Sequence, residues 1–391
     1  MITTLMPSAG ATLAPDFRVR INDKDITANL RPRLLSLTLT DNRGFEADQL
    51  DIELDDADGQ LRMPGRGAVV SVFLGWQGEA LTGKGDFTVD EVEHHGAPDT
   101  LTIRARSADF RGTLNSRREV SYHDTTLGAV VDQIADRNNL TAAVSDALKS
   151  INITHIDQTQ ETDAAFITRL AELNGAVAAI KAGRLMLFKP GGGKSVSGKT
   201  IPQISIERRD GDRHSFSIAD RGAYTGVTAS WLHTKDPQQK TAKAKTKVQR
   251  KPKIQHLRAL QHPKAKTTKA KVVKTPKPPE AKEGEYLVGS EDNVFALTTV
   301  YATKAAAMRA ATAKWNKLQR GVAEFSLTLA MGRADIYPET PVAVKGFKSV
   351  IDEQQWIISK VTHNLSNSGY TTGLELEVLL SDIEFSADDE S

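Results

Sequence analysis

The chain has 391 residues, of which 39% are hydrophobic and none is cysteine, and its formal net charge at pH 7 is +2. This composition is typical of a soluble globular protein of two or three domains, and it excludes a disulfide scaffold and a cysteine nucleophile. The longest apolar run, residues 68–76, is far shorter than the roughly 20 residues that span a bilayer, so we expect no stable membrane insertion. Residues 1–15 lack the pattern of a signal peptide, so we expect synthesis and assembly in a host cytoplasm.

Residues 1–115 alternate apolar and polar side chains, as antiparallel β-strands do when one face is buried. Turn residues separate about six such runs, which is the size of a barrel or a sandwich. The apolar positions include Phe17, Val19 and Ile21, then Leu35, Leu37 and Leu39, then Leu50, Ile52 and Leu54, then Val70, Val72 and Leu74, and then Phe87, Val89 and Val92.

Residues 116–200 change to helical spacing and predict a small α+β domain of two helices and a hairpin. The hairpin covers residues 176–188. The candidate terminal residues are Asp124 or Thr125 and Asn138 for the first helix, and Thr162 or Asp163 and Gly175 for the second.

Residues 201–234 and 300–384 predict a second β domain, which contains one Ala-rich helix at residues 303–319. Between them, residues 235–285 are rich in Lys and Pro and predict a disordered, flexible insertion, because they cannot bury enough apolar surface to offset the entropy of ordering. Residues 235–282 carry 16 basic and 2 acidic side chains, a local charge of +14, so the rest of the chain sits near −12. The insertion is either a solvated tether or a contact for nucleic acid or an acidic protein; without aromatic residues to stack on bases, the sequence favours the tether or the acidic partner.

One hairpin pattern occurs twice along the chain. Trp356, Ile358, Val361 and His363 repeat the spacing of Phe87, Val89, Val92 and His94, and the second strands are aligned as Leu101 with Leu374 and Ile103 with Leu376. Two such copies predict two related β domains, so that three chains would present six similar units around an axis. The alternative interpretation is that any two amphipathic hairpins look alike.

Two motifs suggest chemistry, but neither of them is complete. Residues 193–200 match the phosphate-binding P-loop pattern around Lys199, yet a period-two segment with Pro202 follows where the mechanism needs a helix. Residues 55–59 resemble a calcium loop, but the first and last loop positions hold Leu54 and Gly65. The histidines form no ligand set, and a nucleophile elbow is absent from the sequence. We expect no metal, no cofactor and no catalytic residue.

Long blocks of the sequence resemble the late-control D proteins of contractile-tailed temperate phages. The blocks are residues 50–61, 70–76 and 85–110, and residues 165–188 also resemble the hub portion of type VI secretion spikes. The resemblance implies a mainly β, α+β fold with two tube-like antiparallel β barrels, in residues 1–115 and in residues 201–234 with 300–384. It also implies a structural protein and not an enzyme, located in the baseplate of the virion tail.

The same resemblance implies a homotrimeric baseplate hub that adapts the hexameric tail tube to the trimeric spike. Its partners would be two further copies of the chain, the tail tube protein, the tail spike protein, the tape measure protein and other baseplate proteins. DNA would pass through its channel without specific binding. Two alternatives stay open: a hub with an additional cell-wall hydrolase activity, which would need a further domain, and a nucleic-acid-binding protein that acts through the basic segment.

A channel for DNA must not hold phosphates, and an acidic lining prevents such binding. The acids that alternate with core residues along the strands are the candidate lumen-facing residues, namely Asp51, Glu53, Asp55, Glu375 and Glu377. The alternative is that these acids lie on the outer, solvent-exposed surface of the protein, where the same alternation is expected.

Overall fold

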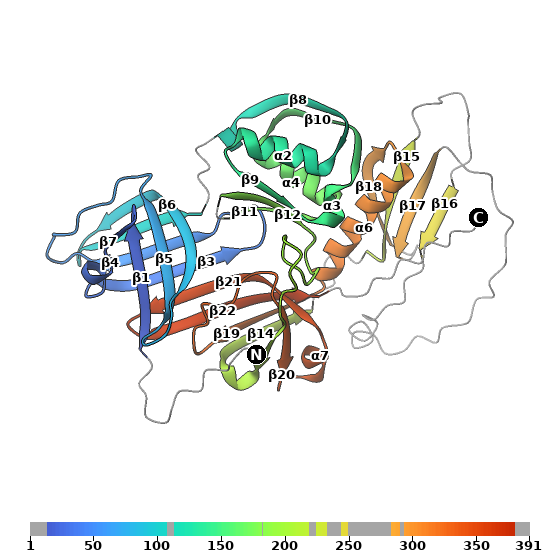
Figure 1. Cartoon of the computed structure of the whole chain (residues 1–391). Helices are drawn as coiled ribbons and strands as arrows, with labels where there is room; N and C mark the ends of the chain where they lie inside the picture. The colour runs from blue at the N-terminus through green and yellow to red at the C-terminus, as the bar shows by residue number, and fades with distance from the viewer. Residues whose placement is uncertain are drawn as a thin grey trace.

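The computed structural model describes residues 14–107, 113–181, 183–218, 224–232, 244–248, 283–289 and 293–379. The fold is mainly β, and its largest element is a thirteen-stranded sheet, nearly all antiparallel. Three smaller sheets of two, three and four strands accompany it. In Figure 1 the large sheet occupies the left and lower parts of the molecule, and the longer helices lie above and to the right of it.

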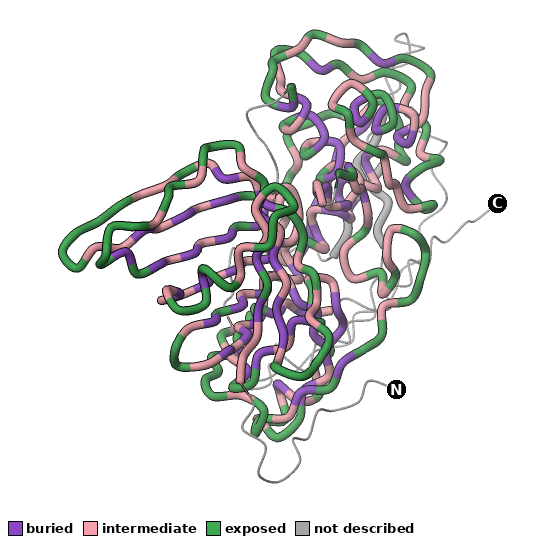
Figure 2. Tube along the Cα trace, turned by 60° about the vertical axis from the view of Figure 1, so that its left-hand side comes forward, coloured by how far each residue is buried: buried purple, intermediate pink, exposed green. Residues whose placement is uncertain are grey.

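The first half of the large sheet has the strand order β3-β4-β7-β6-β5-β1, with β2 at its edge. Its elements are β1 (Pro15–Ile21), β2 (Lys24–Asp25), α1 (Thr27–Leu30), β3 (Leu34–Asn42), β4 (Gln49–Asp55), β5 (Val69–Trp76), β6 (Thr82–His95) and β7 (Thr100–Arg106). Buried and more exposed residues alternate along these strands (Figure 2), which confirms the period-two prediction.

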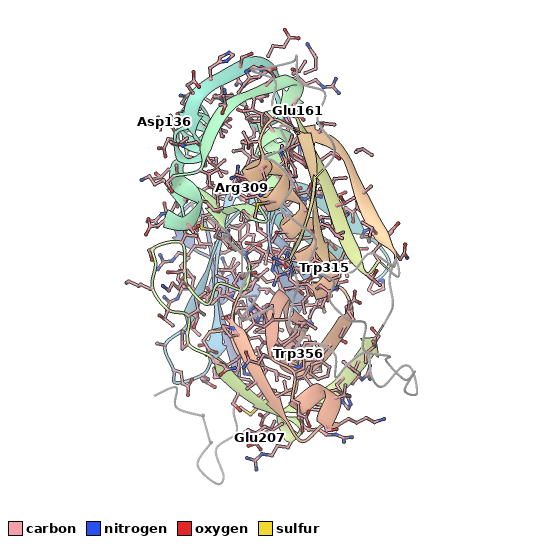
Figure 3. The ribbon with its side chains drawn as sticks, turned by 90° about the vertical axis from the view of Figure 1, so that its right-hand side faces the viewer. Asp136, Glu161, Glu207, Arg309, Trp315 and Trp356 are labelled. Atoms are coloured by element: carbon pink, nitrogen blue, oxygen red, sulfur yellow. The ribbon has the colours of Figure 1, made fainter. Side chains whose placement is uncertain are left out.

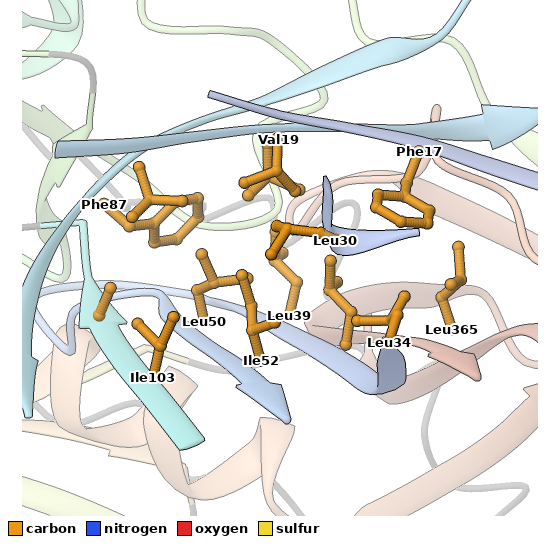
Figure 4. Close-up of a cluster of buried hydrophobic side chains, with 14 of the residues drawn as sticks. Phe17, Val19, Leu30, Leu34, Leu39, Leu50, Ile52, Phe87, Ile103 and Leu365 are labelled. Carbon is orange, nitrogen blue, oxygen red and sulfur yellow. The ribbon is translucent and has the colours of Figure 1, made fainter. Parts of the chain in front are cut away.

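This half curls over its own core. Val19 and Phe17 on β1 face Leu39 and Leu34 across the core, and Leu30 of α1 packs between the two layers (Figure 4). Among the described strands β1 and β3 do not pair with each other, so this half is a curled sheet with an open side.

The second half has the strand order β14-β19-β22-β21-β20-β13. Its elements are β13 (Ile204–Glu207), the 3-10 turn η2 (Arg208–Asp210), β14 (Gly211–Ile218), β19 (Ala323–Leu329), β20 (Pro341–Lys345), α7 (Ser349–Asp352), β21 (Trp356–Ser366) and β22 (Gly369–Val378). Its core is built around Phe325 and Trp356, and the indole nitrogen of Trp356 donates to the Ile351 carbonyl at 3.0 Å.

The two halves repeat one topology. Their six principal strands follow the same order along the chain and the same order in the sheet, so that β14 corresponds to β3 and β21 to β6. Both copies also have two matching bulges. The first bulge lies between Leu34 and Ser36 in the first half and between Gly211 and Arg213 in the second half. The second bulge lies between Val89 and Glu91 in the first half and between Ile358 and Lys360 in the second half. One pairing differs, because β1 is antiparallel to β5 whereas β13 is parallel to β20.

The hairpin repeat is therefore confirmed, but its second strand was aligned two residues out of register. In the structure Ile103 lies opposite Val92 and Leu374 lies opposite Val361, so Leu374 corresponds to Ile103. The strands of the second hairpin run two residues further beyond the shared pair, to Ser366 and Gly369, than those of the first, to His95 and Thr100, and a shift of two residues leaves the alternating pattern unchanged.

The residues between the two halves form a separate α+β unit. Its elements are η1 (Thr113–Asn115), β8 (Arg117–Thr126), α2 (Leu127–Arg137), β9 (Thr141–Val144), α3 (Asp146–Lys149), β10 (Asn152–Thr162), α4 (Asp163–Leu173), β11 (Val177–Lys181) and β12 (Arg184–Phe188). The Thr162 cap is confirmed, since its hydroxyl accepts from the Ala165 amide at 3.1 Å. The first helix begins later than predicted, because Thr126 caps it by accepting from the Ala129 amide at 3.3 Å.

A fourth unit combines a four-stranded sheet with one long helix. Its elements are β15 (Gly226–Leu232), β16 (Ala244–Val248), β17 (Glu283–Gly289), β18 (Val294–Tyr301) and α6 (Lys304–Arg320). Trp231 of β15 and Trp315 of α6 share a core that is separate from the core around Trp356 (Figure 3).

This unit changes two expectations from the sequence. Residues 226–232 and the helix near residues 303–319 were assigned to the second β domain, but β15 and α6 do not join the large sheet, because their apolar faces cover each other. The insertion at residues 235–285 was expected to lack structure, yet β16 and the start of β17 lie within it and pair in parallel. Its other residues lie outside the described part of the chain.

Candidate functional site

The face of the large sheet that points away from the two cores is polar across both halves. The halves join where β3 pairs with β21, in antiparallel register from Ser36 opposite Ser366 to Asn42 opposite Lys360. Directly opposite residues share a face. One row across five strands therefore consists of Asn364, Thr38, Asp51, Arg104 and Glu91, and the next consists of Ser366, Ser36, Glu53, Thr102 and Glu93. We call this surface the polar face.

The structure brings the five candidate lumen-facing acids onto this one face. Asp51, Glu53 and Asp55 follow each other at every second position of β4, and Glu375 and Glu377 do the same on β22. Asp55 ends its strand, and its carboxylate accepts from the Ala57 amide at 2.9 Å.

Basic residues neutralise part of this acidic charge. Arg104 lies 3.8 Å from Asp51 and forms ion pairs with Glu91 at 2.8 Å and with Glu93 at 2.9 Å. Hydrogen bonds from Arg104 and His95 lower the pKa of Glu93. Lys360 pairs with Glu375 at 3.3 Å. The polar face thus alternates acids with a smaller number of bases, which the spacing of the acids in the sequence did not reveal.

A buried arginine fastens the two halves together behind the polar face. Arg43 follows β3, and it forms ion pairs at 2.5 Å with Glu339 and with Glu377 of the second half. Its backbone amide and its guanidinium donate to the carbonyls of Ser359 and Ile358, both at 3.2 Å. Only 12% of the Arg43 and Glu339 side chains is exposed, and burial raises the pKa of Glu339.

A second buried cluster joins three units. Lys181 of β11 binds Asp41 and lies 3.2 Å from Asp48, so it docks the α+β unit onto the first half of the sheet. Lys84 lies 3.9 Å from Asp41, and its ammonium group donates to the carbonyls of Ala334 and Ile336 in the second half at 3.3 and 3.4 Å. Burial lowers the pKa of Lys84 to about 8 and raises the pKa of Asp48 to about 6. The positions of these charged residues in the sequence do not predict that they form a cluster, because they lie on different parts of the fold.

The structure rejects the P-loop interpretation. Lys194 bridges to Thr200, and the amide of Ser195 donates to the Lys199 carbonyl at 2.7 Å, so residues 193–200 form a tight hairpin. The elements that follow are β13 and the short turn η2, and no helix begins at the hairpin to supply the amides that hold phosphate. The calcium-loop segment is likewise a turn, in which Asp56 is buried and accepts from the Leu61 amide at 2.9 Å.

Histidines and acids do not gather into a metal site in the described ranges, where no group of three or more such residues lies together. His363 is fully buried and hydrogen bonds with Thr372 and Tyr370 at 3.1 Å, so it is part of the core. The described helices include none with the length and apolar character needed to cross a membrane.

Comparisons with known proteins agree with this architecture. The chain superposes on the 43 kDa tail protein of prophage MuSo2 from Shewanella oneidensis with a TM-score of 0.61 at 12% identity, over 93% of this chain and 98% of that one. It superposes on the tail protein from Neisseria meningitidis MC58 with a TM-score of 0.60 at 14% identity, over 93% and 96% of the two chains. The fold is therefore that of phage tail proteins.

Sequence comparison narrows this class to one family. Residues 35–369 match the model of the phage tail baseplate hub (GPD) family, and the chain belongs to this family. It is 67% identical over 388 residues to the "probable baseplate hub protein" of Escherichia phage 186, covering 99% of each chain. It is 66% identical over 390 residues to the protein of the same name from Escherichia phage P2, covering 100% of each. The resemblance to late-control D proteins is confirmed, and the family places the chain in a phage tail.

Proposed function

We propose that this hub protein is a structural subunit of a homotrimeric ring that adapts the hexameric tail tube to the trimeric spike. In this proposal each half of the large sheet supplies one tube-like barrel unit: β1 to β7 form the first, and β13, β14 and β19 to β22 form the second. Three chains then offer six similar units to the tube and three identical chains to the spike.

The observation that carries the proposal is the internal repeat. Two six-stranded units with the same strand order and the same two bulges lie edge to edge in one chain, joined by β3 and β21. A single chain that contains two equivalent units supports a ring in which threefold and near-sixfold symmetry coexist.

We further propose that the polar face lines the channel of the ring, through which the tape measure protein and DNA pass. Asp51, Glu53, Asp55, Glu375 and Glu377 repel phosphates there, because like charge prevents the counterion release that drives nucleic-acid binding. Their partial pairing with Arg104 and Lys360, and that of Glu377 with Arg43, leaves an excess of acid on the face.

Two measurements test the ring and its channel. Light scattering or native mass measurement of the purified chain should give a trimer, and a monomer at every concentration contradicts the ring. Reversing two charges of the polar face, with Glu53→Lys and Glu375→Lys, should create DNA binding that weakens steeply with salt and should reduce infectivity.

The matched control for these reversals is Asp136→Lys on α2, which lies in the α+β unit away from the polar face (Figure 3). This change adds to an exposed position the same charge that either reversal adds when it is made singly, so it should leave infectivity near that of the wild type. If Asp136→Lys and the polar-face reversals act alike, the proposed channel lining is wrong.

A further inference from the structure

We infer that copies of this chain join by strand pairing between β14 of one copy and residues 91–95 of β6 in the next copy. The inference rests on the proposed ring and specifies the contact that builds it.

The seam within the chain provides the template. Residues 360–366 of β21 pair with residues 36–42 of β3, and this contact makes the two halves one continuous sheet. The repeat assigns a counterpart to each strand: β14 is the counterpart of β3, and β6 is the counterpart of β21. The shared bulges fix the counterparts residue by residue, because Gly211 and Arg213 flank the bulge that Leu34 and Ser36 flank in the first half.

Both counterpart edges lack a strand partner within the described part of the chain. β14 pairs with β19 alone, whereas its counterpart β3 has a strand on both sides. Residues 91–95 of β6 pair with β7, and the pairing of β6 with β5 ends at Thr88. A free edge presents unpaired backbone amides and carbonyls and is a ready template for another strand. The chain therefore carries one open edge of each kind that its own seam joins.

Side-chain burial shows that these edges lack the cover that the seam provides. In the seam Leu39 and Val361 are at most 1% exposed, and His363 is fully buried. Their counterparts at the open edges are Phe216, Val92 and His94, of which the first two are only partly buried and His94 is exposed. The same positions that the seam buries are thus left uncovered where the seam is missing.

Charge favours pairing between different edges. Residues 213–218 carry Arg213 and His214 and no acid, whereas residues 90–95 carry Asp90, Glu91 and Glu93. Two β14 edges or two β6 edges would bring like charges together, which destabilises cross-strand contacts. The contact is consequently head-to-tail, the kind of interface that closes into a ring when the rotation between copies allows it.

The template also fixes the register of the proposed contact. Because Thr362 lies opposite Thr40 in the seam, Glu93 lies opposite Ser217 between copies. By the same rule Val92 faces Ile218, His94 faces Phe216 and His95 faces Ser215.

Engineered cysteines test this register directly, because the chain has no cysteine of its own. Directly opposite residues on antiparallel strands come close enough for a disulfide. Mild oxidation of the full-length double variant Glu93→Cys with Ser217→Cys should give covalent dimers and trimers on a denaturing gel without reducing agent. A mixture of the two single variants should stop at the covalent dimer.

Two control pairs accompany this variant. The pair Thr362→Cys with Thr40→Cys occupies the equivalent positions inside one chain, so it should close within the monomer and show that the chemistry works. The pair Glu93→Cys with Ser215→Cys is displaced by two residues and should give little covalent trimer.

The outcomes separate this inference from the proposed ring. Covalent trimer from the first pair alone supports the register. A trimer by light scattering, with closure of the seam control but no covalent product from the first pair, overturns the strand contact and leaves the ring. A monomer at every concentration, with no covalent product between chains, overturns both.

Discussion

Replacing Arg43 by Met removes the cation that joins the two halves of the large sheet. The change keeps much of the apolar stem but leaves Glu339 without its ion pair, and 12% of the Glu339 side chain is exposed. Removing one partner of a buried pair costs about 3–5 kcal/mol, although the Gly191 amide, which donates to Glu339 at 2.8 Å, and the nearby Arg320 still favour its charged form. We expect a loss of this size at pH 7, together with loss of the guanidinium hydrogen bond to the Ile358 carbonyl, whereas the backbone amide of residue 43 keeps its bond to Ser359.

The pH dependence of the loss has a defined sign. Burial already raises the pKa of Glu339, and removing Arg43 raises it further, because the guanidinium favours the charged carboxylate. The folded variant then binds its proton at a higher pH than the unfolded chain does, so its stability recovers as the pH falls through the raised pKa. The difference between variant and wild type should therefore be largest at neutral pH and smaller near pH 5.

Urea unfolding, followed by tryptophan fluorescence, measures the loss of folding stability. Variant and wild type are compared at one fixed protein concentration, because assembly itself stabilises the folded chain. The matched control is Arg104→Met on the polar face, where the ion pairs are exposed to water and exposed pairs contribute about 1 kcal/mol or less. Equal losses for the two variants, or a loss below about 1 kcal/mol for Arg43→Met, would refute the reasoning.

Three further predictions concern single positions. Because burial raises the folded pKa of Asp48 to about 6, above the unfolded value of about 3.9, wild-type stability should fall as the pH rises from about 4 to about 6, and Asp48→Asn should remove this decline in urea midpoints. A Cβ at Gly332 would lie 2.4 Å from the Tyr370 ring, so Gly332→Ala should cost about 1–3 kcal/mol, whereas Gly321→Ala, with its nearest atom at 3.8 Å, should be nearly neutral in the same assay. Lys199→Ala should leave tail assembly and infectivity unchanged, and ATP binding by the wild type that this change abolishes would contradict the hairpin interpretation.

Local patterns carried most of the strand prediction. Side chains at every second position of β4 and β7 are buried, and this alternation is visible in any single segment. Helix caps were nearly as visible, with Thr162 identified and the first cap displaced to Thr126. The alignment of the hairpins failed because a shift of two residues leaves the alternating pattern unchanged, so the pattern does not show where a longer strand ends.

Long-range partners were not visible in the sequence. The ion pairs of Arg43 join residues that are hundreds of positions apart, and neither acid stands out among the 49 acids of the chain. β15 and α6 read as parts of the second β domain, because a strand and a helix show which face they bury but not which element covers that face.

The sequence by itself determined that the chain is mainly β, that a hairpin occurs twice, and that Asp51, Glu53 and Glu375 alternate with core residues. These properties follow from side-chain periodicity, which is local. Only the tertiary structure decided that the acids of both halves share one face, that β3 and β21 form the seam, and that β14 and β6 keep open edges. Sheet order is set by contacts between distant strands, and the physical reason it escapes the sequence is that backbone hydrogen bonds are the same for every pair of strands.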